Sequence, residues 1–263
     1  MIGEAVEIRL LGPVEASSDG IQLDLGPRKQ RFGFAVLALE INHTVSVGRL
    51  VDLTWPGRPP RTARHAVQVN ISRLRAVLRA ARTGDTMALT TQGDGYGLRG
   101  DPLRIDAHLF RDLLDRARRC ARDADRVSLL HQALSLWRGP ALAGVGPAED
   151  TDRLTRGLAE DRLAAEEECV DAELQSGNHR RVLGGLLELV ARHPYRQRSV
   201  AQLMIAQYRS GLTADALATY RTASTAMARD MGLDPGRHLR DLERAILRGD
   251  PRLDAVPVPG HRG

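Results

Sequence analysis

Arginine side chains that can bind a nucleic acid are concentrated between Leu53 and Gly84. This 32-residue segment has no aspartate or glutamate and contains seven arginines, which are Arg58, Arg61, Arg64, Arg73, Arg75, Arg79 and Arg82. A guanidinium group binds phosphate oxygens and reads the edge of a guanine base. Over the whole chain, 38 basic residues stand against 33 acidic ones. The segment therefore predicts contact with an anionic duplex, and a solvated basic surface is the alternative.

No other group of residues has the types and spacing of a catalytic or metal-binding site. Cys120 and Cys169 are isolated, and the 8 histidines are scattered without a pair at metal-ligand spacing. The glycines of Gly26–Arg31 and Gly93–Gly97 lack the spacing or the context of a phosphate-binding loop. The three carboxylates of Glu166–Glu168 face three directions on a helix, which favours a solvated face over a metal site. We therefore expect no enzyme, no cofactor and no metal ion.

The positive charge belongs to the N-terminal part of the chain. Residues 1–100 contain 13 basic and 9 acidic side chains, net +4, whereas residues 101–263 contain 25 and 24, net +1. Lys29 is the single lysine, and a GC-rich coding genome or a functional demand for arginine would each explain that usage. Isolated cysteines, the lack of a signal peptide and the lack of a long apolar run predict a cytoplasmic protein without membrane contact.

A helix must position the arginines of this segment, and the periodicity predicts one from Thr62 to about Arg82. At 100° per residue its apolar side chains form one stripe, made of Val67, Ile71, Leu74, Leu78 and Ala81. The opposite face carries His65, Val69, Ser72 and Ala76, flanked by Gln68, Arg73 and Arg79, while Arg64, Arg75 and Arg82 border the stripe. Small side chains allow close approach, and Gln and Arg side chains bind base edges. This face favours DNA contact, because a solvated face normally mixes charges of both signs.

The elements around this helix have the order of a winged helix-turn-helix domain. Alternating apolar residues, Gly-Pro and Asp-Gly breaks and a capping serine predict their positions. They are strands over residues 6–11, 14–17 and 21–25, helices after Gly26-Pro27 and over Val47–Trp55, the helix after Thr62, and a hairpin of Met87–Thr91 with Tyr96–Arg99. A β hairpin after the third helix is the wing of such a domain.

Two cations, Lys29 and Arg31, lie in the first turn of the helix that follows Gly26-Pro27. The amide dipole at a helix N-terminus repels cations, so these residues destabilise the isolated helix slightly. A bound phosphate would explain their position, and a solvated basic turn would explain it equally well.

Three segments of the N-terminal part resemble one family of regulators. They are LGPRKQR at residues 25–31, VSVGRLVDLTW at residues 45–55 and TARHAVQVNISRLR at residues 62–75. The segment LWRGPALAG at residues 136–144 is similar to the second domain of the same family. On these segments the chain is identified as a member of the Streptomyces antibiotic regulatory protein family of transcriptional activators. The resemblance implies an OmpR-type winged helix followed by a bacterial transcriptional activator domain.

The resemblance implies that the third helix is the recognition helix and enters the DNA major groove. In the family's pattern the residues that face DNA match Gln68, Val69, Asn70, Arg73 and Arg75. The helical periodicity puts Asn70 nearer the edge of the core and Arg75 on the phosphate side. The whole predicted DNA-binding set is Lys29, Arg31, Arg64, His65, Gln68, Val69, Asn70, Ser72, Arg73, Arg75, Arg79, Thr91 and Gln92. The family usually has arginine at the position of Gln92, so we expect a weaker contact at the wing tip.

The resemblance also implies that the loop after the second helix contacts RNA polymerase. The residues predicted for this contact are Trp55, Pro56, Arg58, Pro59 and Arg61. The family usually has Trp-Gly-acid at the start of the loop, where this chain has Trp55-Pro56-Gly57-Arg58. We therefore expect the polymerase contact to differ in detail.

The C-terminal part is predicted to be almost wholly helical after a short link at residues 102–106. Two units align at an offset of 34 residues, in which Ala172 matches Ala206 and Gly177 matches Gly211. A helix pair that recurs every 34 residues is typical of tetratricopeptide repeats, which stack to cover their apolar faces. Such a region serves either as a scaffold that orients or dimerises the reader or as a groove for a peptide or small regulatory ligand.

The predicted fold class is mainly α with small β, in two domains and a tail. Residues 1–100 are predicted to form the winged helix, residues 104–250 the tetratricopeptide-like activator domain, and residues 251–263 a disordered tail. The predicted function is sequence-specific activation of transcription. The resemblance implies that the genes activated belong to a secondary-metabolite cluster. The partners implied are double-stranded DNA with direct repeats, RNA polymerase holoenzyme and a second copy of the chain on DNA.

Two other functions remain open at the level of the sequence. One is a repressor of the same fold, which the sequence distinguishes from an activator only through the resemblance of the polymerase loop. The other is an adaptor that would use the tetratricopeptide-like region to capture a protein. The carboxylate-free segment speaks against the adaptor, since an adaptor has no need to exclude acids there.

Overall fold

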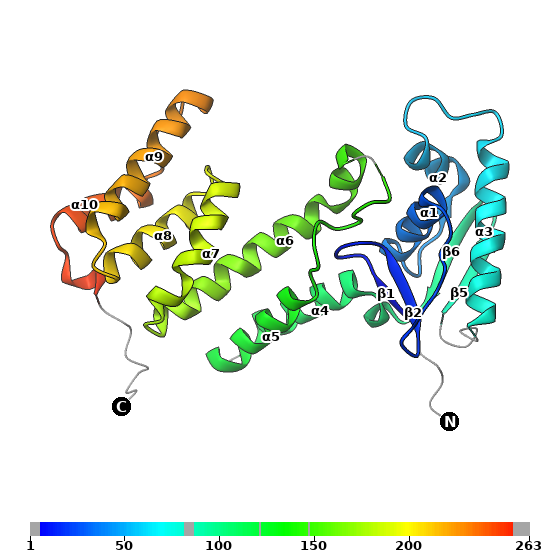
Figure 1. Cartoon of the computed structure of the whole chain (residues 1–263), viewed down its shortest axis with the longest axis horizontal. Helices are drawn as coiled ribbons and strands as arrows, with labels where there is room; N and C mark the ends of the chain where they lie inside the picture. Colours follow the sequence, from blue (N-terminus) through cyan, green and yellow to red (C-terminus); the bar gives the residue numbers. More distant parts are fainter. Residues whose placement is uncertain (1–5, 82–86, 121, 147, 255–263) are drawn as a thin grey trace. The chain divides into compact units, whose positions relative to one another are not determined.

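The computed structural model describes residues 6–81, 87–120, 122–146 and 148–254 (Figure 1). Arg82 and residues 255–263 of the predicted tail lie outside the described residues. The chain divides into two compact units, Met1–Leu163 and Ala164–Gly263. The division falls within helix α6 (Ala148–Gln175), so the first unit extends well past the predicted domain boundary near residue 100.

The first unit begins with two small antiparallel sheets and three helices. The first sheet has the order β1-β2-β3, with β1 at Val6–Arg9, β2 at Glu15–Ser18 and β3 at Ile21–Gln22. The helices are α1 (Arg28–Leu39), α2 (Val47–Thr54) and α3 (Ala63–Ala80). The second sheet has the order β4-β6-β5, with β4 at Val45–Ser46, β5 at Met87–Gln92 and β6 at Gly95–Gly100. This is the winged helix-turn-helix order, and the predicted fold class is confirmed.

The local sequence explains where these elements begin and which sides they bury. Val6 and Ile8 of β1 are buried and Glu7 and Arg9 are exposed, as the alternation predicted. Helix α2 begins after Ser46, whose hydroxyl accepts a hydrogen bond from the Arg49 amide at 3.2 Å. In α3 the buried residues recur at helical spacing and are Ala63, Val67, Ile71, Leu74 and Leu78. The predicted stripe is thus confirmed from Val67 to Leu78.

Helices α4 (Asp106–Arg119) and α5 (Asp123–Ser135) belong to the same compact unit as the winged helix. They follow a 3₁₀ turn at Pro102–Arg104 and pack against each other. The rings of Phe110 and Trp137 meet edge to face, with centroids 5.4 Å apart. The aromatic pair is a local anchor for the loop that follows α5.

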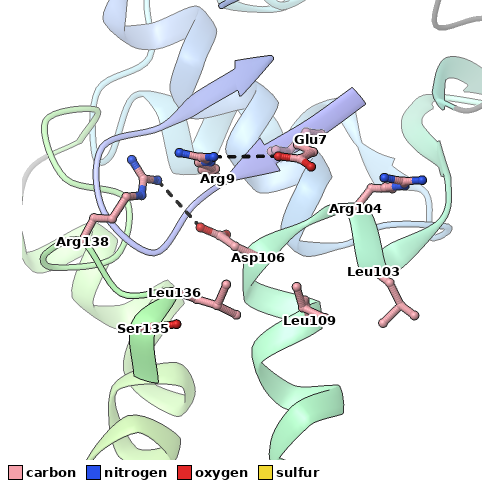
Figure 2. A pocket seen from close by; sticks show the side chains of 10 residues that line it. Glu7, Arg9, Leu103, Arg104, Asp106, Leu109, Ser135, Leu136 and Arg138 are labelled. Atoms are coloured by element: carbon pink, nitrogen blue, oxygen red, sulfur yellow. Dashed lines mark ion pairs between the residues drawn. The ribbon is translucent and has the colours of Figure 1, made fainter. Parts of the chain in front are cut away.

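A buried carboxylate joins α4 to the end of β1. Asp106 accepts hydrogen bonds from the amides of Leu10 at 2.6 Å and Leu11 at 3.1 Å, and Arg138 extends toward it (Figure 2). The Arg138 guanidinium also binds the Glu15 carboxylate at 2.7 Å, and its amide donates to the Leu11 carbonyl at 2.7 Å. Burial raises the pKa of Asp106 above its usual value, against the lowering effect of these donors. The link near residue 105 is therefore a packed joint.

The family-like segment 136–144 takes part in this joint through its backbone. The amide of Leu142 donates to the Leu10 carbonyl at 2.9 Å, and the amide of Ala143 donates to the Gly12 carbonyl at 3.0 Å. A cavity of about 480 Å³ lies alongside, lined by Glu7, Arg9, Leu109 and Leu136 among others (Figure 2). The two ion pairs drawn there, Glu7 with Arg9 and Asp106 with Arg138, join residues of the cavity wall to one another.

The second unit is helical throughout its described residues. It contains the end of α6, then α7 (His179–Arg192), α8 (Gln197–Arg209), α9 (Thr213–Met231), α10 (Arg237–Leu247) and a 3₁₀ turn at Pro251–Leu253. Its core brings together α8, α9 and α10 through buried side chains that include Val200, Met204, Ala216, Met227 and Leu239. Consecutive helices from α7 to α10 pack on one another, as expected for stacked helix pairs.

The predicted 34-residue repeat appears as two turns of the same geometry. Gly177, between α6 and α7, has φ of 80°, and Gly211, between α8 and α9, has φ of 82°. Both lie in the left-handed region that glycine adopts without strain. The start of the predicted tail differs from expectation, because Leu253 packs on the core and its carbonyl accepts a 2.7 Å hydrogen bond from Arg209 Nε.

Candidate nucleic-acid interface

Helix α3 presents a continuous polar face to solvent. Its exposed residues are Arg64, His65, Gln68, Ser72, Arg73, Ala76, Arg79 and Ala80, and its half-buried residues include Val69, Asn70 and Arg75. No aspartate or glutamate occurs anywhere in the helix. The helix contacts α1 and α2 on its apolar side, which holds this face outward. Within the described residues, Arg73 and Arg79 bind no carboxylate and no carbonyl, so their guanidinium groups are available to an external anion.

Arg75 is placed differently from the other arginines of α3. Its Nε donates to the Leu89 carbonyl at 3.0 Å, and its Nη2 donates to the Thr91 hydroxyl at 2.6 Å. The guanidinium also lies over the Tyr96 ring, 5.7 Å from its centroid. Arg75 therefore joins α3 to both strands of the wing.

The predicted wing residue Gln92 lies in a network of polar contacts. Its side-chain oxygen accepts hydrogen bonds from the Thr44 hydroxyl at 2.5 Å and from Arg99 Nη2 at 2.7 Å. Arg99 also donates to the Asn42 carbonyl. At the wing tip, Asp94 lies 3.5 Å from Arg64 of α3. These contacts hold the wing to the β4 segment and to α3.

The first turn of α1 contains Lys29 and Arg31, the two cations predicted to bind DNA. No side chain caps this helix after Pro27, and no acidic residue lies in its first turn. The Arg31 side chain is half-buried, and its Nε has no hydrogen-bond partner within the described part of the chain. The Lys29 ammonium lies 4.7 Å from the centre of the Trp55 ring. The structure thus brings together Lys29, predicted to bind DNA, and Trp55, predicted to contact polymerase.

The loop after α2 is fully exposed from Pro56 to Arg61. The amide of Arg58 donates to the Pro56 carbonyl at 3.1 Å, and the amide of Ala63 donates to the Pro60 carbonyl at 2.9 Å. These local hydrogen bonds and the three prolines of the loop restrict its backbone. Within the described residues, Arg58 and Arg61 form no ion pair, so their charges face solvent.

Several long-range contacts of the first unit were not predicted from the sequence. Asp106, Arg138, Tyr96, Thr44 and Arg99 make contacts with residues that are distant in the chain, such as the pair of Leu10 with Asp106, 96 positions apart. A period or a motif reports neighbours along a helix or strand and carries no information on such pairs. In the described part of the chain, no three His, Cys, Asp or Glu side chains gather as a metal site. No helix there has the length and apolarity needed to span a membrane.

The chain has the strands, three helices and wing of a winged-helix domain, its third helix has no acidic residue, and a helical region follows. These features define the class of winged-helix transcription regulators. Residues 23–98 match the family model described as transcriptional regulatory protein, C terminal. Residues 105–247 match the model described as bacterial transcriptional activator domain. The chain belongs to the Streptomyces antibiotic regulatory protein family, as its sequence segments predicted.

Relatives match nearly the whole chain. It is 35% identical to the regulatory protein DnrI of Streptomyces peucetius, over 95% of this chain and 94% of DnrI. It is 38% identical to the regulatory protein AfsR of Streptomyces coelicolor, over 95% of this chain but 25% of AfsR, so it spans a quarter of that relative. The structure of Mycobacterium tuberculosis EmbR in complex with a low affinity phosphopeptide superposes with a TM-score of 0.86 and 31% identity, over 94% of this chain and 66% of that chain. The matched models and relatives are regulators, and none is described as an enzyme.

Proposed function

We propose that the chain is a sequence-specific activator of transcription that binds double-stranded DNA with α3 in the major groove. The observation that carries the proposal is the outward face of α3, which has no carboxylate and has two arginines without a partner among the described residues. A duplex supplies the phosphates and base edges that such a face lacks within the protein.

The proposed contacts divide by exposure and chemistry. His65, Gln68, Ser72 and Arg73 are exposed on this face and are proposed to read bases, together with the half-buried Val69 and Asn70. Arg64 and Arg79 at its two ends are proposed to bind phosphates, as are Lys29 and Arg31 at the start of α1. Thr91 and Gln92 lie on the wing, where exposed backbone and side-chain groups are proposed to approach the adjacent DNA strand.

The loop after α2 is proposed to recruit RNA polymerase holoenzyme. The proposed contact residues are Trp55, Pro56, Arg58, Pro59 and Arg61, of which those from Pro56 on are exposed. Arg58 and Arg61 have no ion pair within the described part of the chain and suit an acidic surface of the polymerase. Side-by-side copies of the chain on direct repeats in the cytoplasm, at promoters of a secondary-metabolite gene cluster, are part of the same proposal. They derive from membership of the family.

A footprint on the DNA around the protein's own locus tests the DNA-binding part. We expect protection of direct repeats, and we expect scrambled repeats to bind more weakly by a factor of about 10³ or more. Equal binding to both sequences would remove the sequence-specific part of the proposal. Loss of all binding at moderate salt would remove the DNA-binding part.

In vitro transcription with wild type and the Arg58→Ala variant tests the activator part. The variant is expected to keep its footprint and to lose stimulation of the transcript, because Arg58 lies outside α3 and the wing. Repression by the wild-type protein at a bound promoter would favour the repressor of the same fold. Pull-down of one protein partner without any DNA preference would favour the adaptor.

A further inference from the structure

A well-formed polar contact of Arg75 connects the recognition helix and the wing. Arg75 Nε and Nη2 donate to the Leu89 carbonyl and the Thr91 hydroxyl, at 3.0 and 2.6 Å. Leu89 and Thr91 are two residues apart in β5, whereas Tyr96, under the guanidinium, belongs to β6 and is the cross-strand partner of Thr91. One side chain of α3 thus contacts both strands of the hairpin.

Arginine is suited to this position in a way that lysine is not. Its planar fork presents two donors in fixed directions, and its face stacks on an aromatic ring. The Tyr96 ring is 9% exposed, so it forms a firm base for the stacked guanidinium. A lysine would keep the positive charge and lose the forked pair of hydrogen bonds.

A second polar contact between α3 and the wing, the ion pair of Arg64 with Asp94, is weaker. Arg64 and Asp94 are 3.5 Å apart, and their side chains are 66% and 72% exposed. An ion pair so open to water contributes little to stability and is screened by salt. Helix α3 also packs on β5, where Met87 and Leu89 are buried. Of the two polar contacts, that of Arg75 therefore does more to set the position of the wing relative to the groove-reading face.

We infer that Arg75 is a positioning residue that locks the wing to the recognition helix, and that phosphate binding is not its main role. The inference rests on the proposed function, since it assigns a task within DNA reading. Thr91 is the acceptor for this lock, so its hydroxyl serves the protein's own structure. The groove-reading face and the wing then meet the duplex as one rigid unit.

Two variants separate the lock from a phosphate contact. Arg75→Lys keeps the charge that a phosphate needs and removes the fork, and Thr91→Val removes the acceptor without changing charge. Arg79→Ala is the matched control, because Arg79 lies one helical turn further along α3 without a partner in the described residues.

The first measurement is amide hydrogen exchange over residues 87–100 in the full-length protein without DNA. We expect Arg75→Lys and Thr91→Val each to speed exchange in the hairpin about tenfold, because local opening loses one restraint. Arg79→Ala is expected to leave this exchange unchanged. Unchanged exchange in both Arg75→Lys and Thr91→Val would overturn the inference.

The second measurement is the salt dependence of binding to the footprinted DNA. The lock predicts that Arg75→Lys and Thr91→Val weaken binding with the wild-type salt slope, whereas Arg79→Ala lowers the slope by about 1. Wild-type binding by Arg75→Lys, with a slope lowered by about 1 in Arg75→Ala, would assign Arg75 to a phosphate and overturn the lock. If wild type shows no DNA preference, the proposed function fails, and the exchange measurement still decides the lock.

Discussion

The arginines on the face of α3 and those around the start of α8 are in opposite situations. In the first unit, Arg73 and Arg79 are exposed and have no acidic partner in the described residues. In the second unit, Arg196 lies 3.2 Å from Glu167, and Arg198 lies 2.7 Å from Asp171. Arg73 and Arg79 can therefore bind an external anion, whereas Arg196 and Arg198 bind carboxylates of the protein itself.

Burial of the carboxylate accounts for much of this difference. Glu167 is 1% exposed and also accepts a 2.7 Å hydrogen bond from the Ser199 hydroxyl. A buried carboxylate requires such donors, because an unpaired charge away from water is strongly destabilising. Arginine content alone therefore does not indicate a nucleic-acid site, and the absence of nearby acids is the more informative signal.

Glu167 also corrects an expectation from the sequence. The run Glu166–Glu168 was expected to form a solvated face, and its middle member is instead buried and bound by α8. Three adjacent residues on a helix face three directions, so one of them meets whatever packs on that side. The sequence did not show that α8, some 30 residues later, packs there with Arg196 and Ser199.

Glu167→Ala should produce the largest loss of stability. We expect the free energy of unfolding of the second unit to fall by about 3 kcal/mol, the low end of the range for a broken buried pair, because Arg196 and Arg198 still reach water. Urea unfolding followed by circular dichroism measures it. Glu188→Ala, at an exposed site of α7, is the control and should change little. An equal change in the free energy of unfolding for the two substitutions would contradict the distinction between charges bound within the fold and charges exposed to solvent.

Arg73→Ala should weaken DNA binding by about 1–3 kcal/mol on the footprinted sequence and less on scrambled DNA, because base contacts distinguish the two. Titration of labelled duplexes at one stated salt concentration measures both affinities. The unfolding midpoint should stay at the wild-type value, since Arg73 has no partner in the described residues. An equal loss on the two duplexes would reassign Arg73 from bases to phosphate.

Arg79→Ala should have a smaller, sequence-independent effect. We expect the slope of log K against log salt to fall by about 1, with a similar loss of affinity on cognate and scrambled DNA. The same titrations repeated at several salt concentrations give this slope. A wild-type slope in the variant would show that the end of α3 lies away from the DNA backbone.

Arg237→Ala should have the smallest effect. Arg237 and Asp241 form an i,i+4 pair at 3.4 Å in α10, with side chains 90% and 50% exposed. Such a surface pair changes stability by no more than about 0.5 kcal/mol. Urea unfolding should be within error of wild type, and DNA binding should be unchanged. A loss near that of Glu167→Ala would contradict the assignment of stability to the buried carboxylate.

Much of the fold was predictable because it depends on neighbours along the chain. The buried stripe of α3 from Val67 to Leu78 follows from helical spacing, and the start of α2 follows from Ser46. The repeat glycines Gly177 and Gly211 marked two equivalent turns. These features depend on residues within one or two turns of each other.

The joint between the winged helix and the helices after it was not predictable. The sequence predicted a short link at residues 102–106, and it did not show that Asp106 binds the amides of Leu10 and Leu11. The same holds for the Lys29 ammonium over the Trp55 ring. Each of these pairs is distant in the chain and is brought together only by packing.

The sequence by itself determined the family, the winged-helix order and the outward, acid-free face of α3. Periodicity sets which side of a helix is apolar, and composition sets which charges remain on the other side. Only the tertiary structure decided that Arg73 and Arg79 have no partner in the part of the chain that is described, while Arg75 binds the wing and Arg138 binds the joint. The reason is physical, because a guanidinium binds the acceptor that packing brings within about 3 Å, and packing is a property of the whole unit.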